Sequence, residues 1–326
     1  MVAGLRRLAR MGGQVRDLGP LLPDRDWRIM RARAAREKEP AMIRHYLRVT
    51  GESRLAVDVG GDPSSPALLL LHGFPSSACT FRRLAPMLVD DLFVVAPDLP
   101  GFGESDVLAS ISFEAMGNAV LEVLDRFSVG PRFIYLHDFG APVGFHVAMH
   151  APALVRGLII QNANAHTSGF GPQWADTIAY WSNPTPENEA AATAHLTREG
   201  IRNEYVGGVP DDVAMCMAAD NWDEDWRVMS LPGRLEAQRA LVADYGNYVR
   251  RFTEIQGYLQ SHQPPALMVW GRHDPFFELA ETLSWMKDLP RMDAHILDAG
   301  HMLLESRAEA AAHLILDFVK REKGLG

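Results

Sequence analysis

Three short and nearly unbroken apolar segments constrain the fold of this chain more than any other feature of its sequence. They cover residues 67–71, 92–96 and 132–136, and they are bounded by Gly, Pro or Asp. Each is too short for a buried helix, and such runs are typical of strands buried on both faces. Between the last two, apolar residues recur at helical spacing from Phe113 to Phe127. The order strand, helix, strand predicts a parallel sheet with helical crossovers.

The same patterns extend the predicted sheet in both directions. Residues 45–49 and 55–59 alternate in polarity around a turn that contains Gly, which predicts a β-hairpin at one edge. Residues 155–160, 266–270 and 294–297 have the composition of further strands, and an amphipathic helix follows the last of them. We therefore expect an α/β protein with a mostly parallel central sheet flanked by helices.

One long segment interrupts this order of strands and helices. Residues 162–257 contain helical patches, several Pro and Gly residues and four of the seven Trp residues, but no clear buried strand. We interpret this segment as a helical cap, or lid, inserted into a core made of residues 41–161 and 258–326. Residues 1–40 precede the core as a separate basic extension.

The extension differs in charge from the rest of the chain. It holds nine Arg and one Lys against five acidic residues, although the whole chain has a formal charge of -9 at pH 7. Leu5, Leu8 and Met11 lie at helical spacing, so a helix on a membrane surface, a solvated tail and a helix packed on the cap all stay open. We expect no secretory signal and no transmembrane segment, because no apolar stretch reaches 18 residues.

Charge and cysteine content limit the expected partners. The net negative charge argues against nucleic acid as a binding partner, because phosphate binding needs a surplus of Lys and Arg on one face of the protein. Cys79 and Cys216 are far apart and lack the spacing of metal ligands. We expect a cytoplasmic protein that needs no metal ion or other cofactor and acts on a small, largely apolar organic substrate with water. The oligomeric state stays open, and a homodimer is one alternative.

Asp138 lies where the predicted strand at residues 132–136 meets a predicted helix, which is the context of a nucleophile elbow. A sharp turn of this kind presents one side chain, and Gly140 supplies the small residue needed two positions later. The position two residues before the nucleophile holds Leu136, which is larger than usual. Taken alone, Asp138 is equally well explained as the N-cap of the following helix.

Residues that follow other predicted strands make helix capping an insufficient explanation for Asp138. The loop after the first buried strand contains Phe74, whose N–H is expected to join that of Phe139 in an oxyanion hole. Asp274 follows the next-to-last predicted strand, and His301 follows the last. Since parallel strands end at one edge of the sheet, we expect Asp138, Asp274 and His301 to converge in the order nucleophile, acid, histidine.

With these motifs the sequence resembles the α/β-hydrolase superfamily over about residues 41–326, and within it the branch of epoxide hydrolases and haloalkane dehalogenases. The motifs are His72-Gly73-Phe74-Pro75, Asp98-Leu99-Pro100-Gly101-Phe102-Gly103-Glu104-Ser105, His137-Asp138-Phe139-Gly140-Ala141, the segment from Gly271 to Pro275, and Gly300-His301. The resemblance implies that Asp138 is the nucleophile, that Asp274 orients the histidine, that His301 is the base and that a cap closes over the pocket.

An aspartate nucleophile favours displacement at a saturated carbon. A carboxylate with an ordinary pKa near 3.9 is ionised at neutral pH, so no base is needed to start the attack. The attack leaves an ester on Asp138, and water deprotonated by His301 then attacks the ester carbonyl. Plain esterase activity is disfavoured by this arrangement.

The choice between the two enzyme types depends on what stabilises the leaving group. An epoxide leaves an alkoxide, and enzymes of this branch commonly stabilise it with tyrosines from the cap. Tyr245 and Tyr180 are the candidates, and Asp244-Tyr245-Gly246-Asn247 is similar to the second tyrosine segment of epoxide hydrolases. Trp174 and Trp181 are candidates for an apolar pocket wall.

A halide needs N–H donors instead, and the dehalogenases that the sequence resembles often carry Asn and Trp where this chain has Phe74 and Phe139. Phe139 is also unusual for epoxide hydrolases. We expect a hydrolase that acts at an sp3 carbon through an ester on Asp138, with an epoxide hydrolase as the first hypothesis. A haloalkane dehalogenase, a lyase or cyclase and a non-catalytic receptor on the same fold stay open, and the sequence does not specify the substrate.

Overall fold

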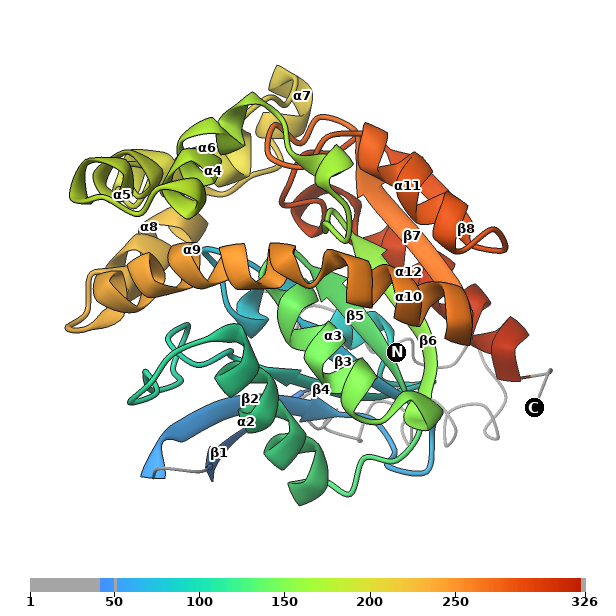
Figure 1. Cartoon of the computed structure of the whole chain (residues 1–326). Helices are drawn as coiled ribbons and strands as arrows, with labels where there is room; N and C mark the ends of the chain where they lie inside the picture. The colour runs from blue at the N-terminus through green and yellow to red at the C-terminus, as the bar shows by residue number, and fades with distance from the viewer. Residues whose placement is uncertain (1–41, 50–51, 324–326) are drawn as a thin grey trace, which may run out of the picture. The chain divides into compact units, whose positions relative to one another are not determined.

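An eight-stranded sheet forms the centre of the computed structural model, which describes residues 42–49 and 52–323 (Figure 1). The strand order is β1-β2-β4-β3-β5-β6-β7-β8, with β1 and β2 antiparallel to their neighbours and the strands from β4 to β8 parallel. The strands are β1 (Ile43–Arg48), β2 (Arg54–Gly60), β3 (Ala67–Leu71), β4 (Phe93–Pro97), β5 (Arg132–His137), β6 (Val155–Gln161), β7 (Ala266–Gly271) and β8 (Asp293–Leu297). The predicted α/β class, the edge hairpin and the parallel sheet are confirmed. The predicted extension at residues 1–40 lies outside the described residues.

Helices flank the sheet, and a run of them is inserted between β6 and β7. The helices are α2 (Phe113–Arg126), α3 (Gly140–His150), α4 (Ala175–Ser182), α5 (Pro186–Ala192), α6 (Arg198–Val206), α7 (Asp211–Ala214), α8 (Ala219–Met229), α9 (Arg234–Arg250), α10 (Phe252–His262), α11 (Ala280–Asp288) and α12 (Leu304–Lys323). We call residues 162–265, which carry α4 to α10, the insertion. The predicted cap limits stay a prediction, and α10 runs through residue 257, where that cap was expected to end. Of the helices that the structure describes, none has the length and apolar character needed to cross a bilayer.

The apolar strands bury both faces, as their sequences predict. In β3, Leu69 and Leu71 join one apolar cluster together with residues of α2, α3, α10 and α11. Leu68 and Leu70 point to the opposite face and join a second cluster that contains residues of α12. Because successive side chains of a strand alternate between faces, only a segment with apolar residues at every position suits a sheet covered on both sides.

Hydrogen bonds at the start of α2 attach the insertion to the core. The Ser112 side chain accepts a hydrogen bond from the Ala115 N–H at 3.1 Å, which caps the helix. Asp244 of α9 accepts a second bond, 2.8 Å long, from the N–H of Phe113. The next residue of α9, Tyr245, packs its ring against Phe113 with 5.9 Å between ring centroids. The capping contact therefore fixes the position of a tyrosine that the sequence singles out.

The turn between β5 and α3 holds Asp138 in the left-handed region of backbone space, with φ 48°. This conformation is uncommon for a residue other than Gly, although Asp tolerates it better than most. Gly140 lets the turn sit close to the end of β3, because a Cβ at this position would lie 2.4 Å from the carbonyl oxygen of Leu71. The predicted need for a small residue at this position therefore has a direct steric cause.

The unusual Leu136 is accommodated from the opposite side of the turn. Gly144 lies one turn into α3, and a Cβ there would come within 2.1 Å of Cδ2 of Leu136. Leu136 is fully buried. A small residue on the helix thus replaces the small residue that an elbow usually has on the strand, and helix and strand still approach closely.

Because Gly144 makes room for Leu136, substitutions at these two positions should have coupled effects on the free energy of unfolding. Gly144→Ala should lower the free energy of unfolding by about 2 kcal/mol, because the added methyl group overlaps the fully buried side chain of Leu136, which must then shift within the core. In a Leu136→Ala background the same substitution should cost much less, which gives a coupling energy of about 1 kcal/mol or more in a double-mutant cycle. Urea unfolding of the four variants measures it. Gly257→Ala in α10 is the control, since an added Cβ meets no atom of the described chain within 4 Å. Equal costs of Gly144→Ala in both backgrounds would contradict this coupling.

Candidate active site

The carboxylate of Asp138 is buried at the end of β5 and bonded to backbone N–H groups. Its Oδ2 accepts a hydrogen bond of 2.7 Å from the N–H of Phe74. The N–H of Phe139 also bonds this carboxylate. These are the two donors that the sequence predicts for an oxyanion hole, and in the described structure they hold the carboxylate itself.

His301 and Asp274 form a buried pair at the same edge of the sheet. Nδ1 of His301, which follows β8, lies 2.8 Å from Oδ2 of Asp274, which follows β7. The other oxygen of Asp274 accepts bonds from the N–H groups of Phe276 at 2.8 Å and Phe277 at 3.2 Å. The structure therefore gives Asp274 the orienting contact that the sequence predicts for it.

Asn162 is a further partner of Asp274 that the sequence analysis does not include. It directly follows β6, and its side-chain amide donates a 2.8 Å bond to Oδ2 of Asp274. The oxygen of this Asn162 side-chain amide accepts a 2.8 Å hydrogen bond from the N–H of Gly271. A polar residue directly after a buried strand is the signal that also singles out Asp138, so Asn162 could have been found from the sequence.

The free nitrogen of His301 faces the insertion. Among the described residues, Nε2 has no hydrogen-bond partner, and Oε2 of Glu204 lies 3.9 Å from it. The His301 ring packs against the ring of Phe277, with centroids 5.4 Å apart, and against that of His137, at 4.7 Å. Nothing in the sequence around Glu204 points to this contact, because α6 carries charged residues on several sides and contains no motif.

These buried charges change one another's proton affinity. Burial raises the pKa of Asp138 to about 6, although the charge of His301 and the two N–H donors oppose the rise. Burial lowers the pKa of His301, but Asp274, Glu204 and Asp138 outweigh it and raise the value to about 9. Burial raises the pKa of the Glu204 carboxyl well above its usual range. The directions of the first two shifts favour an imidazolium at His301 beside an ionised Asp138 near pH 7.

A cavity of about 160 Å³ opens between Asp138 and the insertion. Aromatic side chains make up much of its wall, and a few polar groups interrupt them. The lining residues are Phe74, Asp138, Phe139, Gln173, Trp174, Thr177, Trp181, His195, Gly200, Asn203, Glu204, Val242, Tyr245, Phe276 and Phe277. A small apolar pocket with a few convergent polar groups is the usual form of a small-molecule site.

Tyr245 is the tyrosine that the structure brings into this cavity. Its ring is buried and packs against Phe139 at 5.7 Å and against Trp181 at 5.8 Å between centroids. Among the described residues its hydroxyl forms no hydrogen bond of normal geometry. Burial raises the pKa of this phenol well above its usual value, so the hydroxyl keeps its proton.

Tyr180 does not share this position. It lies half-buried on α4, and it is absent from the described residues that line the cavity. Its neighbour Trp181 lines the cavity instead, because residues one position apart on a helix point in different directions.

His195, which lies between α5 and α6, also lines the cavity, and burial lowers the pKa of its imidazole. No motif in the sequence singles out His195.

Trp174 and Trp181 line the cavity with their rings, but both indole N–H groups are already used. The N–H of Trp174 donates to the carbonyl oxygen of Phe276, and that of Trp181 donates to the carbonyl oxygen of Val242 at 2.8 Å. An N–H engaged with a backbone carbonyl is not free for a ligand. These two residues therefore contribute apolar surface.

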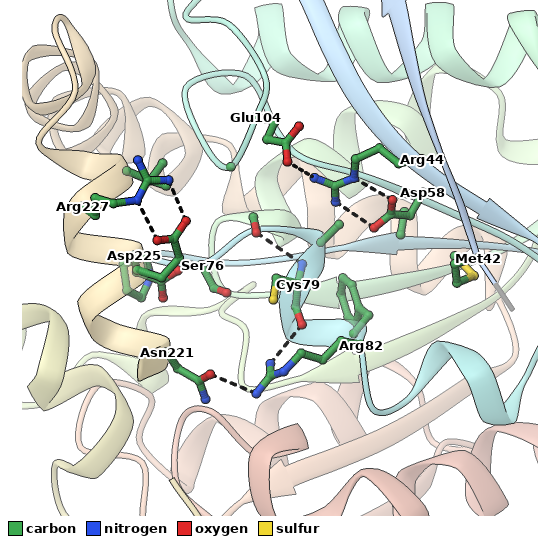
Figure 2. Close-up of a pocket in the computed structure, with 18 of the residues that line it drawn as sticks. Met42, Arg44, Asp58, Ser76, Cys79, Arg82, Glu104, Asn221, Asp225 and Arg227 are labelled. Atoms are coloured by element: carbon green, nitrogen blue, oxygen red, sulfur yellow. Dashed lines mark hydrogen bonds and ion pairs between the residues drawn. The ribbon is translucent and has the colours of Figure 1, made fainter. Parts of the chain in front are cut away.

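A larger cleft of about 850 Å³ lies beside α8 and does not contain Asp138, Asp274 or His301 (Figure 2). Its polar groups are mostly paired with one another. Arg44 bonds Asp58 at 2.8 Å, and Arg82 donates to Asn221 at 3.2 Å, as the dashed lines in Figure 2 show. Because this cleft lacks Asp138, Asp274 and His301, the smaller cavity is the candidate site.

Comparison with known proteins agrees with this geometry. The family model described as alpha/beta hydrolase fold matches residues 66–308, which include the Asp138 turn and His301. The chain belongs to the α/β-hydrolase family.

Three similar proteins illustrate the range of this family. The chain is 30% identical over 278 residues to "Uncharacterized hydrolase YNR064C" of Saccharomyces cerevisiae, covering 83% of this chain and 95% of the relative. It is 26% identical to "Epoxide hydrolase 4" of Mus musculus, covering 91% of this chain and 88% of the relative. The solved structure "Epoxide hydrolase CorEH without ligand" superposes with a TM-score of 0.69 at 21% identity, covering 86% of this chain and 99% of that one. The last likeness concerns the fold alone.

The raised pKa of Asp138 predicts where the hydrolase loses activity in acid. If the ionised carboxylate attacks the substrate, kcat/KM should fall tenfold per pH unit below about 6, since an acid with a raised pKa is protonated at a higher pH than usual. A pH profile of kcat/KM on any accepted substrate measures this limb. A midpoint near 4, the ordinary value for Asp, would contradict the assignment.

Proposed function

We propose that this α/β-hydrolase is an epoxide hydrolase that forms an ester between Asp138 and its substrate. The observation that carries the proposal is the buried hydroxyl of Tyr245, which lies in the same cavity as Asp138. Among the described residues it forms no hydrogen bond of normal geometry, although the Asn164 side chain interacts with it. A buried hydroxyl without a hydrogen bond of normal geometry carries a free-energy cost, which a ligand oxygen would remove. An epoxide oxygen is such an acceptor.

Asp138 is suited to attack carbon in the first step. The N–H of Phe74 holds Oδ2, so Oδ1 is the oxygen that forms the new C–O bond. As that bond forms, the C–O bond of the ring breaks and its electron pair stays on the ring oxygen as an alkoxide. The positive charge on His301 keeps Asp138 ionised for this attack, although the carboxylate is buried.

A polar group of the insertion meets the developing alkoxide. Tyr245 can donate its O–H to the alkoxide, whereas the neutral imidazole of His195 already bonds the backbone of Ala192. Tyr245 belongs to the insertion, and its ring packs among the aromatic rings of the cavity wall. Donors aimed at a charge that develops only in the transition state accelerate the reaction more than they strengthen binding of the substrate.

The second step hydrolyses the ester. Water attacks the Asp138 carbonyl carbon, and the N–H groups of Phe74 and Phe139 stabilise the negative charge on Oδ2. His301 takes a proton from the water through Nε2, while Asp274 holds Nδ1. Collapse of the tetrahedral species breaks the ester bond to the substrate oxygen, which takes the remaining proton of the added water, so the diol is released and Asp138 returns as a carboxylate.

Haloalkane dehalogenation has less support at this site. A halide leaving group needs N–H donors, but the indole N–H groups of Trp174 and Trp181 bond backbone carbonyls. The side chains of Phe74 and Phe139 have no donor. A phenol hydroxyl matches an alkoxide better than a halide.

Tyr245→Phe should lower kcat/KM for an epoxide by about a hundredfold, because it removes one donor to the developing oxyanion and leaves the packing of the ring in place. Diol formation, measured on a panel of small aryl and alkyl epoxides, checks this. Tyr180→Phe is the matched control, since that tyrosine belongs to the same insertion but not to the cavity wall, and it should change kcat/KM less than twofold. Full activity of the Tyr245 variant on a proven epoxide would show that the phenol does not stabilise the alkoxide.

His301→Gln should still complete the first step, more slowly because loss of the imidazolium raises the pKa of Asp138, and should stop at the ester, because attack by Asp138 needs no base whereas hydrolysis does. Intact-protein mass spectrometry should show a gain equal to the whole substrate for an epoxide, or to the alkyl group alone for a haloalkane. Digestion should locate the adduct on the peptide that contains Asp138. A variant that also carries Asp138→Ala should form no adduct. An adduct elsewhere, or an alkyl adduct from haloalkanes only, would overturn the proposed function.

A further inference from the structure

Glu204 is the one carboxyl that the insertion brings to the wall of the cavity. It lies in α6, its side chain is 9% exposed, and its Oε2 lies 3.9 Å from Nε2 of His301. This nitrogen has no hydrogen bond among the described residues. A separation of about 4 Å is close enough for one water molecule to bond both atoms. Glu204 and His301 are therefore in position to exchange a proton.

The two steps of the reaction place opposite demands on protons, and the contact between Glu204 and His301 can meet both. The alkoxide of the first step must gain a proton, whereas His301 must lose one before it can act as a base. The groups that act on His301 are Asp274, Glu204, Asp138 and His137. Together they keep His301 protonated near pH 7, since its pKa is raised to about 9. Tyr245 is a poor proton source, because burial disfavours its phenolate.

We propose that Glu204 carries a proton from His301 to the leaving oxygen of the substrate, so that the insertion couples ring opening to ester hydrolysis. This relay rests on the proposed epoxide hydrolase function.

The protons and charges of the relay balance over one turnover. In the resting site Asp138 is ionised, His301 is protonated and Glu204 is protonated. Ring opening turns Asp138 into an ester, and the alkoxide takes the proton of Glu204 to become a hydroxyl. The new Glu204 carboxylate then receives the proton on Nε2 of His301, directly or through a bridging water. Ester hydrolysis returns one proton to His301 and the negative charge to Asp138, which restores the resting site.

The surroundings of Glu204 agree with a group that changes charge during turnover. Burial raises the pKa of its carboxyl well above the usual range, which favours the protonated form. The titratable groups that act on it are His301, which favours ionisation, and Asp138 and Asp274, which oppose it. Conversion of Asp138 to a neutral ester removes one of the opposing charges. Glu204 thus becomes easier to ionise when the alkoxide needs its proton.

Glu204→Gln tests the relay, because an amide of the same shape can form hydrogen bonds but cannot carry a proton. Single-turnover measurements should use an epoxide that forms an ester with the His301→Gln variant. The wild-type ester should hydrolyse at a rate that is independent of pH between 7 and 8. In Glu204→Gln the ester should accumulate at pH 7, its hydrolysis should be at least about tenfold slower, and the rate should rise about tenfold per pH unit, since His301 then loses its proton to solvent.

The matched control is Glu199→Gln, in the same helix. Glu199 is 75% exposed and pairs with Arg202 at 3.0 Å, so its substitution should leave both steps and the flat pH profile unchanged. A Glu204 variant that hydrolyses the ester at the wild-type rate with a flat profile would overturn the relay. Equal slowing of both steps without a new pH dependence would also overturn it, because that result indicates only a change in pocket shape.

A second measurement needs no variant. In weakly buffered solution with an indicator dye, wild-type enzyme should form its ester without taking a proton from solution. Uptake of one proton per ester would mean that solvent, and not an internal group, protonates the alkoxide, and the relay would be wrong. If no epoxide forms an ester even with His301→Gln, the proposed function itself fails and the relay fails with it. Ester formation followed by proton uptake overturns the relay alone.

Discussion

Keeping a carboxylate charged away from water is the physical constraint on which this site depends. Burial alone would leave Asp138 protonated at a higher pH, and a protonated carboxyl does not attack carbon. Backbone N–H groups of Phe74 and Phe139 and the charge of His301 offset that cost. In the proposed mechanism the same N–H groups later stabilise the oxyanion, and His301 later activates water. One set of groups thus serves a carboxylate, an ester and a tetrahedral intermediate in turn.

The parallel sheet is what makes this set possible. Strands β5, β7 and β8 end at one edge, so the loops after them bring Asp138, Asp274 and His301 together from distant parts of the sequence. The left-handed conformation at Asp138 holds the carboxylate at this edge. At this turn β5 and α3 pack closely, and the absence of a side chain at Gly144 leaves room for Leu136. The position of the Asp138 carboxylate therefore depends on close packing at the turn between β5 and α3.

The sequence predicts the core of this arrangement well and the insertion poorly. Strand patterns and the residues after each strand have local causes, so the sheet and the positions of Asp138, Asp274 and His301 follow from the chain itself. The direction in which an insertion helix presents a side chain depends on packing between distant segments. For that reason the candidate Tyr180 is absent from the described residues that line the cavity, whereas Glu204 lies close to His301 without a signal in its own segment.

The most direct test of the account is a single turnover of wild-type enzyme in water enriched in heavy oxygen, with enzyme in excess over an accepted epoxide. If Asp138 forms an ester, water oxygen enters the carboxylate when the ester is hydrolysed. The account predicts that mass spectrometry finds heavy oxygen in the peptide containing Asp138 and not in the diol of this first turnover. Heavy oxygen in the diol with an unlabelled Asp138 would contradict it, because water would then have attacked the substrate directly.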